Sequence, residues 1–341
     1  MKRRDLFKYI IGSCLYLLTN KDFSIKVSEY PKIGFTFTVW NNSNLHTYDV
    51  IKRLIEIGIK DISIHIPWYQ DFKESTEIHN YKSGVKATPD DKYIKELIYD
   101  AKENNMCIMI KPCIYVLDKN TWHGEIEPKD KDKWFKSYSE IILHYVNIAK
   151  KHNIEIFCIG NELTSMEKYV DRWEALIKDI RKSYNGKLTY GANYNSYENV
   201  RFFDKLDYIG ISAYFPLRFN KEELIDLNHF LKSWKFHNKK ISEFSKNVKK
   251  PVIFTEIGYR SISGTSLRPY DYKSKSEEDK NEQAICYRAL VMGLLQKLIN
   301  VEKVYIWSSN DGNTLKENDS SGYGIFNKPA EHEIFFYHFD G

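Results

Sequence analysis

Eight short apolar runs recur along the chain after residue 30. They cover residues 33–40, 61–70, 107–116, 154–163, 187–193, 206–214, 251–259 and 304–310. Each run is rich in Ile, Val, Phe and Tyr and is too short for most helices, so it is typical of a buried strand. Helical patterns separate several of the runs. Strands that alternate with helices predict a parallel sheet, because parallel neighbours need a crossover connection.

Segments between the runs carry the apolar stripe of an amphipathic helix. The stripe is found in residues 48–55, 93–101, 138–149, 173–180 and 284–298. Gly58 follows the first segment and predicts a helix stop there. Eight strand–helix units within residues 31–341 predict an α/β fold with a single closed (β/α)8 barrel, the TIM barrel. The alternative is an open doubly wound sheet, but residues 40–43 after the first run are not the G-x-G-x-x-G phosphate loop.

The amino terminus has the layout of an export signal. Lys2, Arg3 and Arg4 form a basic start, and a mostly apolar run from residue 9 to residue 18 is too short for an ordinary membrane span. The paired arginines resemble a twin-arginine signal, and a lipoprotein-like cleavage box ends at Cys14. An uncleaved anchor and a basic helix are the alternatives.

This reading of the amino terminus divides the chain into two parts. We expect an export segment and linker at 1–30 and one catalytic domain at 31–341. The protein is then exported, as a periplasmic, secreted or cell-surface protein. A lipid on Cys14 would tether it to a membrane.

Composition excludes several classes of protein. Hydrophobic residues make up 42% of the chain and charged residues 28%, which argues against global disorder, collagen and a multi-span membrane protein. The net charge of +5 is mild and the basic residues are interleaved with acids, so we expect no nucleic-acid partner. The charged segment 273–281 is typical of a solvated loop or a helix start.

The five cysteines, Cys14, Cys107, Cys113, Cys158 and Cys286, contain no C-x-x-C pair. Three of them lie in the predicted strands, where a free cysteine usually acts as a small core residue. The sequence therefore predicts neither a disulfide framework nor a zinc site. No metal-binding motif is present, and we expect no cofactor.

Two of the predicted strands end in a carboxylate. Glu162 closes the run 154–163, and Glu256 lies near the end of the run 251–259. The carboxyl ends of barrel strands form the active-site face, and these two strands lie on opposite sides of an eight-strand ring. A lone glutamate there would be explained by a salt bridge or a helix cap. Two that converge on one cleft are typical of glycoside hydrolysis.

The motifs around these residues resemble a known family. Asn161-Glu162 together with Glu256 is similar to clan A of the glycoside hydrolases. Five stretches within residues 32–337 resemble glycoside hydrolase family 113, namely 121–128, 134–138, 159–163, 254–259 and 322–331. The resemblance implies a retaining β-1,4-mannanase in which Glu162 is the acid/base and Glu256 is the nucleophile.

The resemblance also implies roles for polar and aromatic residues around the pair. Asn161 would hydrogen-bond the 2-hydroxyl of the sugar at the cleavage point, and Tyr214 would hydrogen-bond the nucleophile. Trp307 would form a stacking floor for that sugar, and Trp40 would form a second platform. The alternatives are that the two tryptophans are core residues and that Tyr214 only packs at the barrel rim. His65 reads as a hydrogen-bonded core histidine.

Lys111 and Trp122 would line the cleft, and Asn193 ends the fifth run. Lys111 could instead extend out of the barrel rim into solvent. The chain departs from the family pattern at two positions. Cys113 stands where the family usually has His, and His123 stands where it often has Arg. The first change removes a strong hydrogen-bonding group near the cleft and leaves the identity of the bound sugar open.

The leading hypothesis is a monomeric endo-β-1,4-mannanase whose partner is a β-linked oligosaccharide or polysaccharide. A carbohydrate-binding barrel without turnover is the alternative from a different class, although a pure binder does not need both carboxylates. A glycosidase or transglycosidase that acts on another β-linked glycan is the third hypothesis. The aromatic content of 15% fits sugar stacking and also fits drift in base composition. Only the aromatic residues at the strand ends therefore support a sugar-stacking cleft.

Overall fold

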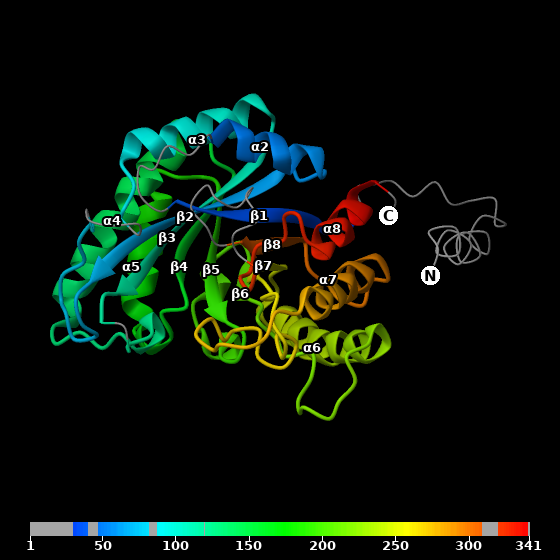
Figure 1. Cartoon of the computed structure of the whole chain (residues 1–341). Helices are drawn as coiled ribbons and strands as arrows, with labels where there is room; N and C mark the ends of the chain where they lie inside the picture. The colour runs from blue at the N-terminus through cyan, green and yellow to red at the C-terminus, as the bar shows by residue number, and fades with distance from the viewer. Residues whose placement is uncertain (1–29, 40–46, 82–86, 119, 309–319, 340–341) are drawn as a thin grey trace. The chain divides into compact units, whose positions relative to one another are not determined.

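The apolar runs form a closed ring of parallel strands. The computed structural model describes residues 30–39, 47–81, 87–118, 120–308 and 320–339, which include all eight strands (Figure 1). The strands are β1 (Lys32–Thr38), β2 (Asp61–Gln70), β3 (Cys107–Val116), β4 (Ile156–Asn161), β5 (Lys187–Asn193), β6 (Ile209–Ser212), β7 (Val252–Ile257) and β8 (Lys303–Ser308). Each strand pairs with the next, and β8 pairs with β1. The closed ring confirms the predicted barrel and excludes the open doubly wound sheet.

Seven α-helices are found within the described residues. They are α2 (Thr47–Glu56), α3 (Asp91–Glu103), α4 (Lys131–Lys151), α5 (Val170–Arg181), α6 (Leu227–Val248), α7 (Lys280–Leu295) and α8 (Pro329–Phe339). Short 3-10 turns are η2 (His123–Glu125), η3 (Thr164–Met166), η4 (Tyr197–Asn199) and η5 (Phe203–Lys205). The first four predicted segments lie within α2, α3, α4 and α5, and the fifth overlaps α7 and extends three residues beyond its end. No helix of the described chain is long and apolar enough to cross a membrane.

Two helices, α6 and α8, were not predicted. In α6 the buried face consists of Phe230, Ser233, Trp234, His237 and Ile241, and the two polar residues break the apolar stripe. In α8 apolar residues occur on all sides, so no single stripe stands out.

Local signals set the helix ends where the sequence predicts them. α2 ends at Glu56, and Gly58 follows it with a φ of 86°. At the start of α7, the carboxylate of Asp279 accepts hydrogen bonds from the backbone N–H groups of Asn281 and Glu282 at 3.0 and 2.8 Å. This N-cap compensates two amide groups that the first helical turn leaves without partners. The charged segment 273–281 is therefore a loop that leads into a helix start, as predicted.

Side chains that point into the barrel alternate along each strand and meet at successive levels. At the lowest level, Lys303 forms an ion pair with Asp61. At the next level, Tyr305, two residues after Lys303 on β8, and Met109 of β3 belong to one buried cluster. Two residues further again, the ammonium of Lys111 lies 5.4 Å from the ring centre of Trp307. The apolar level therefore separates a charged pair at the bottom of the barrel from the polar groups at its top.

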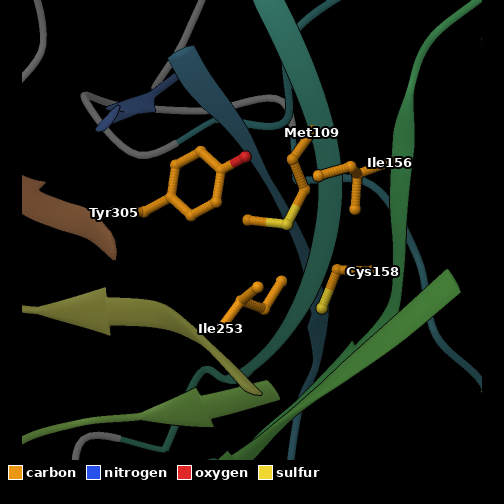
Figure 2. Packing of buried hydrophobic residues seen from close by; sticks show 5 residues of the cluster. All are labelled: Met109, Ile156, Cys158, Ile253 and Tyr305. Atoms are coloured by element: carbon orange, nitrogen blue, oxygen red, sulfur yellow. The ribbon is translucent and has the colours of Figure 1, made fainter. Parts of the chain in front are cut away.

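The buried cluster consists of Met109, Ile156, Cys158, Ile253 and Tyr305, each at most 2% exposed. Figure 2 shows these side chains pointing toward one another from four strands. Four cysteines of the described chain, Cys107, Cys113, Cys158 and Cys286, are free, and all but Cys107 are buried. The reading of the strand cysteines as core residues is confirmed for Cys113 and Cys158.

The predicted runs overlap all eight strands, and five of the runs differ from their strands by one to three residues at each end. The runs 61–70, 107–116 and 187–193 coincide with β2, β3 and β5. β4 stops at Asn161 because Glu162 takes a left-handed conformation with a φ of 50°. The pairing of β4 with β5 also shifts register between Cys158 and Asn161. This local irregularity turns the residue after the strand over the mouth of the barrel.

Candidate active site

Glu256 lies near the end of β7 and is buried, with 4% of its surface exposed. Its Oε1 atom forms an ion pair with Nζ of Lys111 from β3. Its Oε2 atom accepts a hydrogen bond from the hydroxyl of Tyr214, which follows β6, at 3.1 Å. Partners from β3 and from the segment after β6 thus fix the orientation of this β7 carboxylate, and both of its oxygens have a donor.

Charge and burial compete within this group. Burial raises the pKa of Glu256, the charge of Lys111 lowers it, and the charge of Glu162 raises it again, so the pKa lies above its ordinary value. Burial alone would lower the pKa of Lys111, but the charge of Glu256 outweighs it and the pKa of Lys111 rises. Each charge therefore favours the charged form of its partner. Lys111 is fully buried, so the alternative in which it extends into solvent is wrong.

Glu162 follows β4 and is 8% exposed. Its backbone N–H donates to the carbonyl of Gly191 at 2.7 Å, which holds the left-handed turn against β5. The Oε1 atom accepts a hydrogen bond from Nδ2 of Asn193 at 3.0 Å. The Oε2 atom lies 3.4 Å from Nε2 of His123 in η2. Glu162 therefore contacts an amide and an imidazole, whereas Glu256 contacts an ammonium and a phenol.

Asn161 is the last residue of β4 and is 4% exposed. Its Oδ1 atom accepts a hydrogen bond from the hydroxyl of Ser212 at 3.3 Å. Gly191 leaves the space for this side chain, because a Cβ atom there would stand 2.4 Å from Oδ1 of Asn161. A glycine at this point of β5 is thus required by the close approach of its neighbour.

Trp307 of β8 is partly buried and packs edge-on against His65 of β2, with ring centres 5.0 Å apart. Since the ring also faces Lys111, Trp307 borders the charged group. The reading of His65 as a hydrogen-bonded core histidine is confirmed. His65 is 1% exposed, and its nitrogens lie 3.3 Å from Sγ of Cys113 and 2.8 Å from the hydroxyl of Tyr115. Burial lowers its pKa, which favours the neutral imidazole.

The two positions that depart from the family pattern differ in exposure. Cys113 is 4% exposed and contacts His65, so it can influence a sugar only through its neighbours. His123 is partly exposed and contacts Glu162. Trp122 precedes it and is also partly exposed, with its ring centre 5.5 Å from that of His123. The predicted platform residue Trp40 lies outside the described residues, as do Cys14 and most of the segment 1–30.

Sequence reasoning did not identify Glu167, a second buried carboxyl close to Glu162. Burial raises its pKa to about 7. Its Oε1 atom accepts a hydrogen bond from the hydroxyl of Tyr190 at 2.9 Å, and the same hydroxyl accepts one from the N–H of Leu163 at 2.9 Å. The group braces the backbone directly after Glu162. A buried glutamate directly after a 3-10 turn carries no sequence signal that separates it from a surface residue.

The structure brings together Lys111, Asn161, Glu162, Asn193, Tyr214, Glu256 and Trp307 around the carboxyl ends of the strands. Two buried carboxylates with different partners can take different protonation states at one pH. One of them can then act as a nucleophile or base while the other acts as an acid.

Comparison with known proteins agrees with this arrangement. The family model described as Glycoside Hydrolase Family 113 matches residues 34–328. A solved structure described as a complex of a family 113 β-1,4-mannanase is 28% identical, with a TM-score of 0.77, and the match covers 91% of this chain and 99% of that chain. A β-mannanase of that family from Alicyclobacillus acidocaldarius, in complex with ManMIm, is 24% identical, with a TM-score of 0.74 and coverage of 91% and 98%. No curated protein matches the sequence.

Proposed function

The chain belongs to glycoside hydrolase family 113 and is a glycoside hydrolase, and on this premise we propose that it is a retaining endo-β-1,4-mannanase. One observation carries the proposal. Glu162 and Glu256 are both buried at the mouth of the barrel, and their partners differ in charge. We assign Glu162 as the acid/base and Glu256 as the nucleophile.

In the first step Glu256 attacks the anomeric carbon and Glu162 protonates the departing oxygen. The ion pair with Lys111 and the hydrogen bond from Tyr214 hold the Glu256 carboxylate in place for this attack. They also limit the rise of its pKa that burial causes. Glu162 has different partners in the described chain: the neutral amide of Asn193, which donates to Oε1, and the imidazole of His123, 3.4 Å from Oε2.

In the second step Glu162 removes a proton from water, and the water oxygen attacks the glycosyl–enzyme ester at the anomeric carbon. Glu256 then leaves as a carboxylate and regains its contacts with Lys111 and Tyr214. Asn161, whose Oδ1 atom is already oriented by Ser212, is positioned to contact the 2-hydroxyl of the sugar. Trp307 supplies the aromatic face on which that sugar rests.

The choice of mannan as substrate is supported by the 28% identical structure, which is described as a β-1,4-mannanase. A different β-linked glycan is the second candidate. It is favoured by the contact of Cys113 with His65, since that thiol stands where the family usually has a stronger hydrogen-bonding group.

A panel of polysaccharides tests the choice of substrate. The purified protein is expected to release reducing ends from mannan and glucomannan, and to release them from cellulose and xylan at least about 100-fold more slowly. This ratio is the size of discrimination that one or two well-placed hydrogen bonds give. Sizing of the products at early times should show a mixture of oligosaccharides, as internal cleavage requires. Equal rates on mannan and cellulose would contradict mannan specificity, and release of a single short product would contradict internal cleavage.

We also propose that residues 1–30 direct export and that Cys14 carries a lipid, and that the barrel is a monomeric exported domain. The basic start and the apolar run after it support this proposal. A reporter enzyme fused to residues 1–30 is expected to appear outside the cytoplasm, and a Cys14→Ala version is expected to lose membrane association. A fusion that stays in the cytoplasm would contradict export.

A further inference from the structure

Two tyrosines from distant parts of the chain stack on each other at the carboxyl end of β5. Tyr194 directly follows Asn193 at the end of β5, and Tyr270 lies in the loop between β7 and α7. Their ring centres are 5.5 Å apart and their planes differ by 18°. Tyr194 is partly buried and packs edge-on against Phe215, whereas Tyr270 is 43% exposed. One face of the pair is thus supported by the protein, and the outer tyrosine is open to solvent.

The pair lies close to the acid/base. Tyr194 is the neighbour in sequence of Asn193, which donates to Oε1 of Glu162. The pKa of Tyr194 is raised by burial first, then by Tyr270, and the charge of Glu162 contributes to the same rise. The Tyr194 side chain is therefore within electrostatic reach of the carboxylate that protonates the leaving group.

The ring of strands gives the direction of a bound chain. Trp307 pairs in register with Thr36 of β1 and packs on His65 of β2, so the floor of the reacting sugar lies on the β1 side. Trp307 itself is on β8, and in a closed ring of eight strands β4 is opposite β8, with β5 next to β4. A glycan that starts over Trp307 and passes Glu256 and then Glu162, which follows β4, therefore reaches the end of β5, where Tyr194 lies with Tyr270 stacked on it. With Glu162 as the acid, this is the leaving-group side.

The loop that carries Tyr270 is held in place on both sides of it. The carbonyl of Pro269 accepts a hydrogen bond from the hydroxyl of Tyr323 at 2.7 Å, and the carbonyl of Asp271 accepts one from Arg260 at 3.3 Å. Tyr323 in turn packs edge-on against Tyr214, the partner of Glu256. A ring fixed in this way loses little freedom when a ligand stacks on it.

From these observations we propose that Tyr194 and Tyr270 form a stacking platform for a pyranose ring on the leaving-group side of the scissile bond. The proposal rests on the proposed function, since the leaving-group side is defined by Glu162 as acid. The ligand class is a β-linked pyranose unit, which has an apolar face of C–H groups that matches an exposed aromatic ring. The platform would bind the departing part of the polysaccharide and, after cleavage, an incoming sugar acceptor.

The experiment compares two substrates that differ only on the leaving-group side. Mannohexaose places sugars on the platform, whereas β-mannotriosyl fluoride has a leaving group without a ring. Tyr270→Ala is expected to lower the ratio of kcat/KM between the hexaose and the fluoride about tenfold, which corresponds to about 1.4 kcal/mol. Tyr270→Phe, which keeps the ring, is expected to restore most of that ratio. Tyr272→Ala is the matched control, because Tyr272 is 58% exposed in the same loop and is outside the platform.

An equal loss of kcat/KM on both substrates would mean that Tyr270 only braces Asn193 and Glu162, and would overturn the platform. A fall of the ratio in Tyr272→Ala as large as in Tyr270→Ala would overturn it as well.

If the wild type cleaves no mannan, the proposed function fails, and a binding measurement then tests whether Tyr194 and Tyr270 form a stacking platform. Calorimetry with Glu162→Gln and the hexasaccharides of mannose, glucose and xylose should then show at least one ligand whose affinity falls about tenfold when Tyr270→Ala is added. No binding, or no such fall, would overturn the proposal.

Discussion

The Glu256→Gln variant is expected to lower kcat/KM on β-1,4-mannan by at least about 10⁴-fold, because an amide cannot form the glycosyl ester on which the proposed mechanism depends. The ring-free substrate β-mannotriosyl fluoride separates the two carboxylates. Glu162→Gln should still release about one fluoride per enzyme molecule in a rapid burst, since fluoride leaves without a proton donor. Glu256→Gln should release none. Fluoride release is measured with a selective electrode after rapid mixing.

Glu167→Gln is the matched control for these variants, because Glu167 is a buried glutamate near Glu162 that hydrogen-bonds Tyr190 and not the carboxylate pair. It should retain activity within about tenfold of the wild type. Folding of Glu256→Gln must be verified by circular dichroism, since the change leaves Lys111 without its charged partner. The assignment would be wrong if Glu256→Gln kept its burst or if proton NMR showed that the first product has the inverted configuration.

The Lys111→Met variant is expected to lose both stability and nucleophilic activity. Removal of one member of a buried ion pair costs about 3–5 kcal/mol, because the remaining charge has no compensation. Without Lys111 the pKa of Glu256 rises further, since the Lys111 charge is the largest influence that lowers it. A nucleophile must be ionised, so the acidic limb of the kcat/KM profile should move to higher pH. The measurement is the pH profile on mannan, together with thermal unfolding.

Lys303→Met separates the loss of stability from the shift in pH profile. Lys303 also forms a mostly buried ion pair, with Asp61, but at the opposite end of the barrel and below the apolar level. Loss of the Lys303–Asp61 ion pair is expected to lower the melting temperature and to leave the acidic limb of the kcat/KM profile unchanged. Two results would contradict the role of Lys111 as the group that controls the charge of Glu256. One is a shift of the acidic limb of the kcat/KM profile in Lys303→Met, and the other is an unshifted acidic limb in Lys111→Met.

The fold could be predicted from the sequence because each strand carries its own signal. The runs 61–70, 107–116 and 187–193 needed only local apolarity and coincide with strands. The same locality explains why α6 was missed, since two of the five residues on its buried face, Ser233 and His237, are polar and break the local apolar stripe.

The site could be predicted only in part. Glu162 and Glu256 were identified because each ends an apolar run, but their partners come from segments far away in sequence. Lys111 and Glu256 are 145 residues apart, and no local pattern distinguishes a lysine buried against a carboxylate from one that extends into solvent. His123 was noted as a departure from the family pattern, and its contact with Glu162 became visible only in three dimensions.

The left-handed backbone at Glu162, with its φ of 50°, places catalysis and stability in opposition at a single residue. A side chain with a Cβ atom pays on the order of 1 kcal/mol for this conformation, which glycine adopts freely. A selection for heat resistance alone would therefore favour glycine or asparagine at position 162 and would discard the proposed proton donor. An engineer who seeks a more durable form of this enzyme has to exclude that position from the search, however favourable its apparent gain.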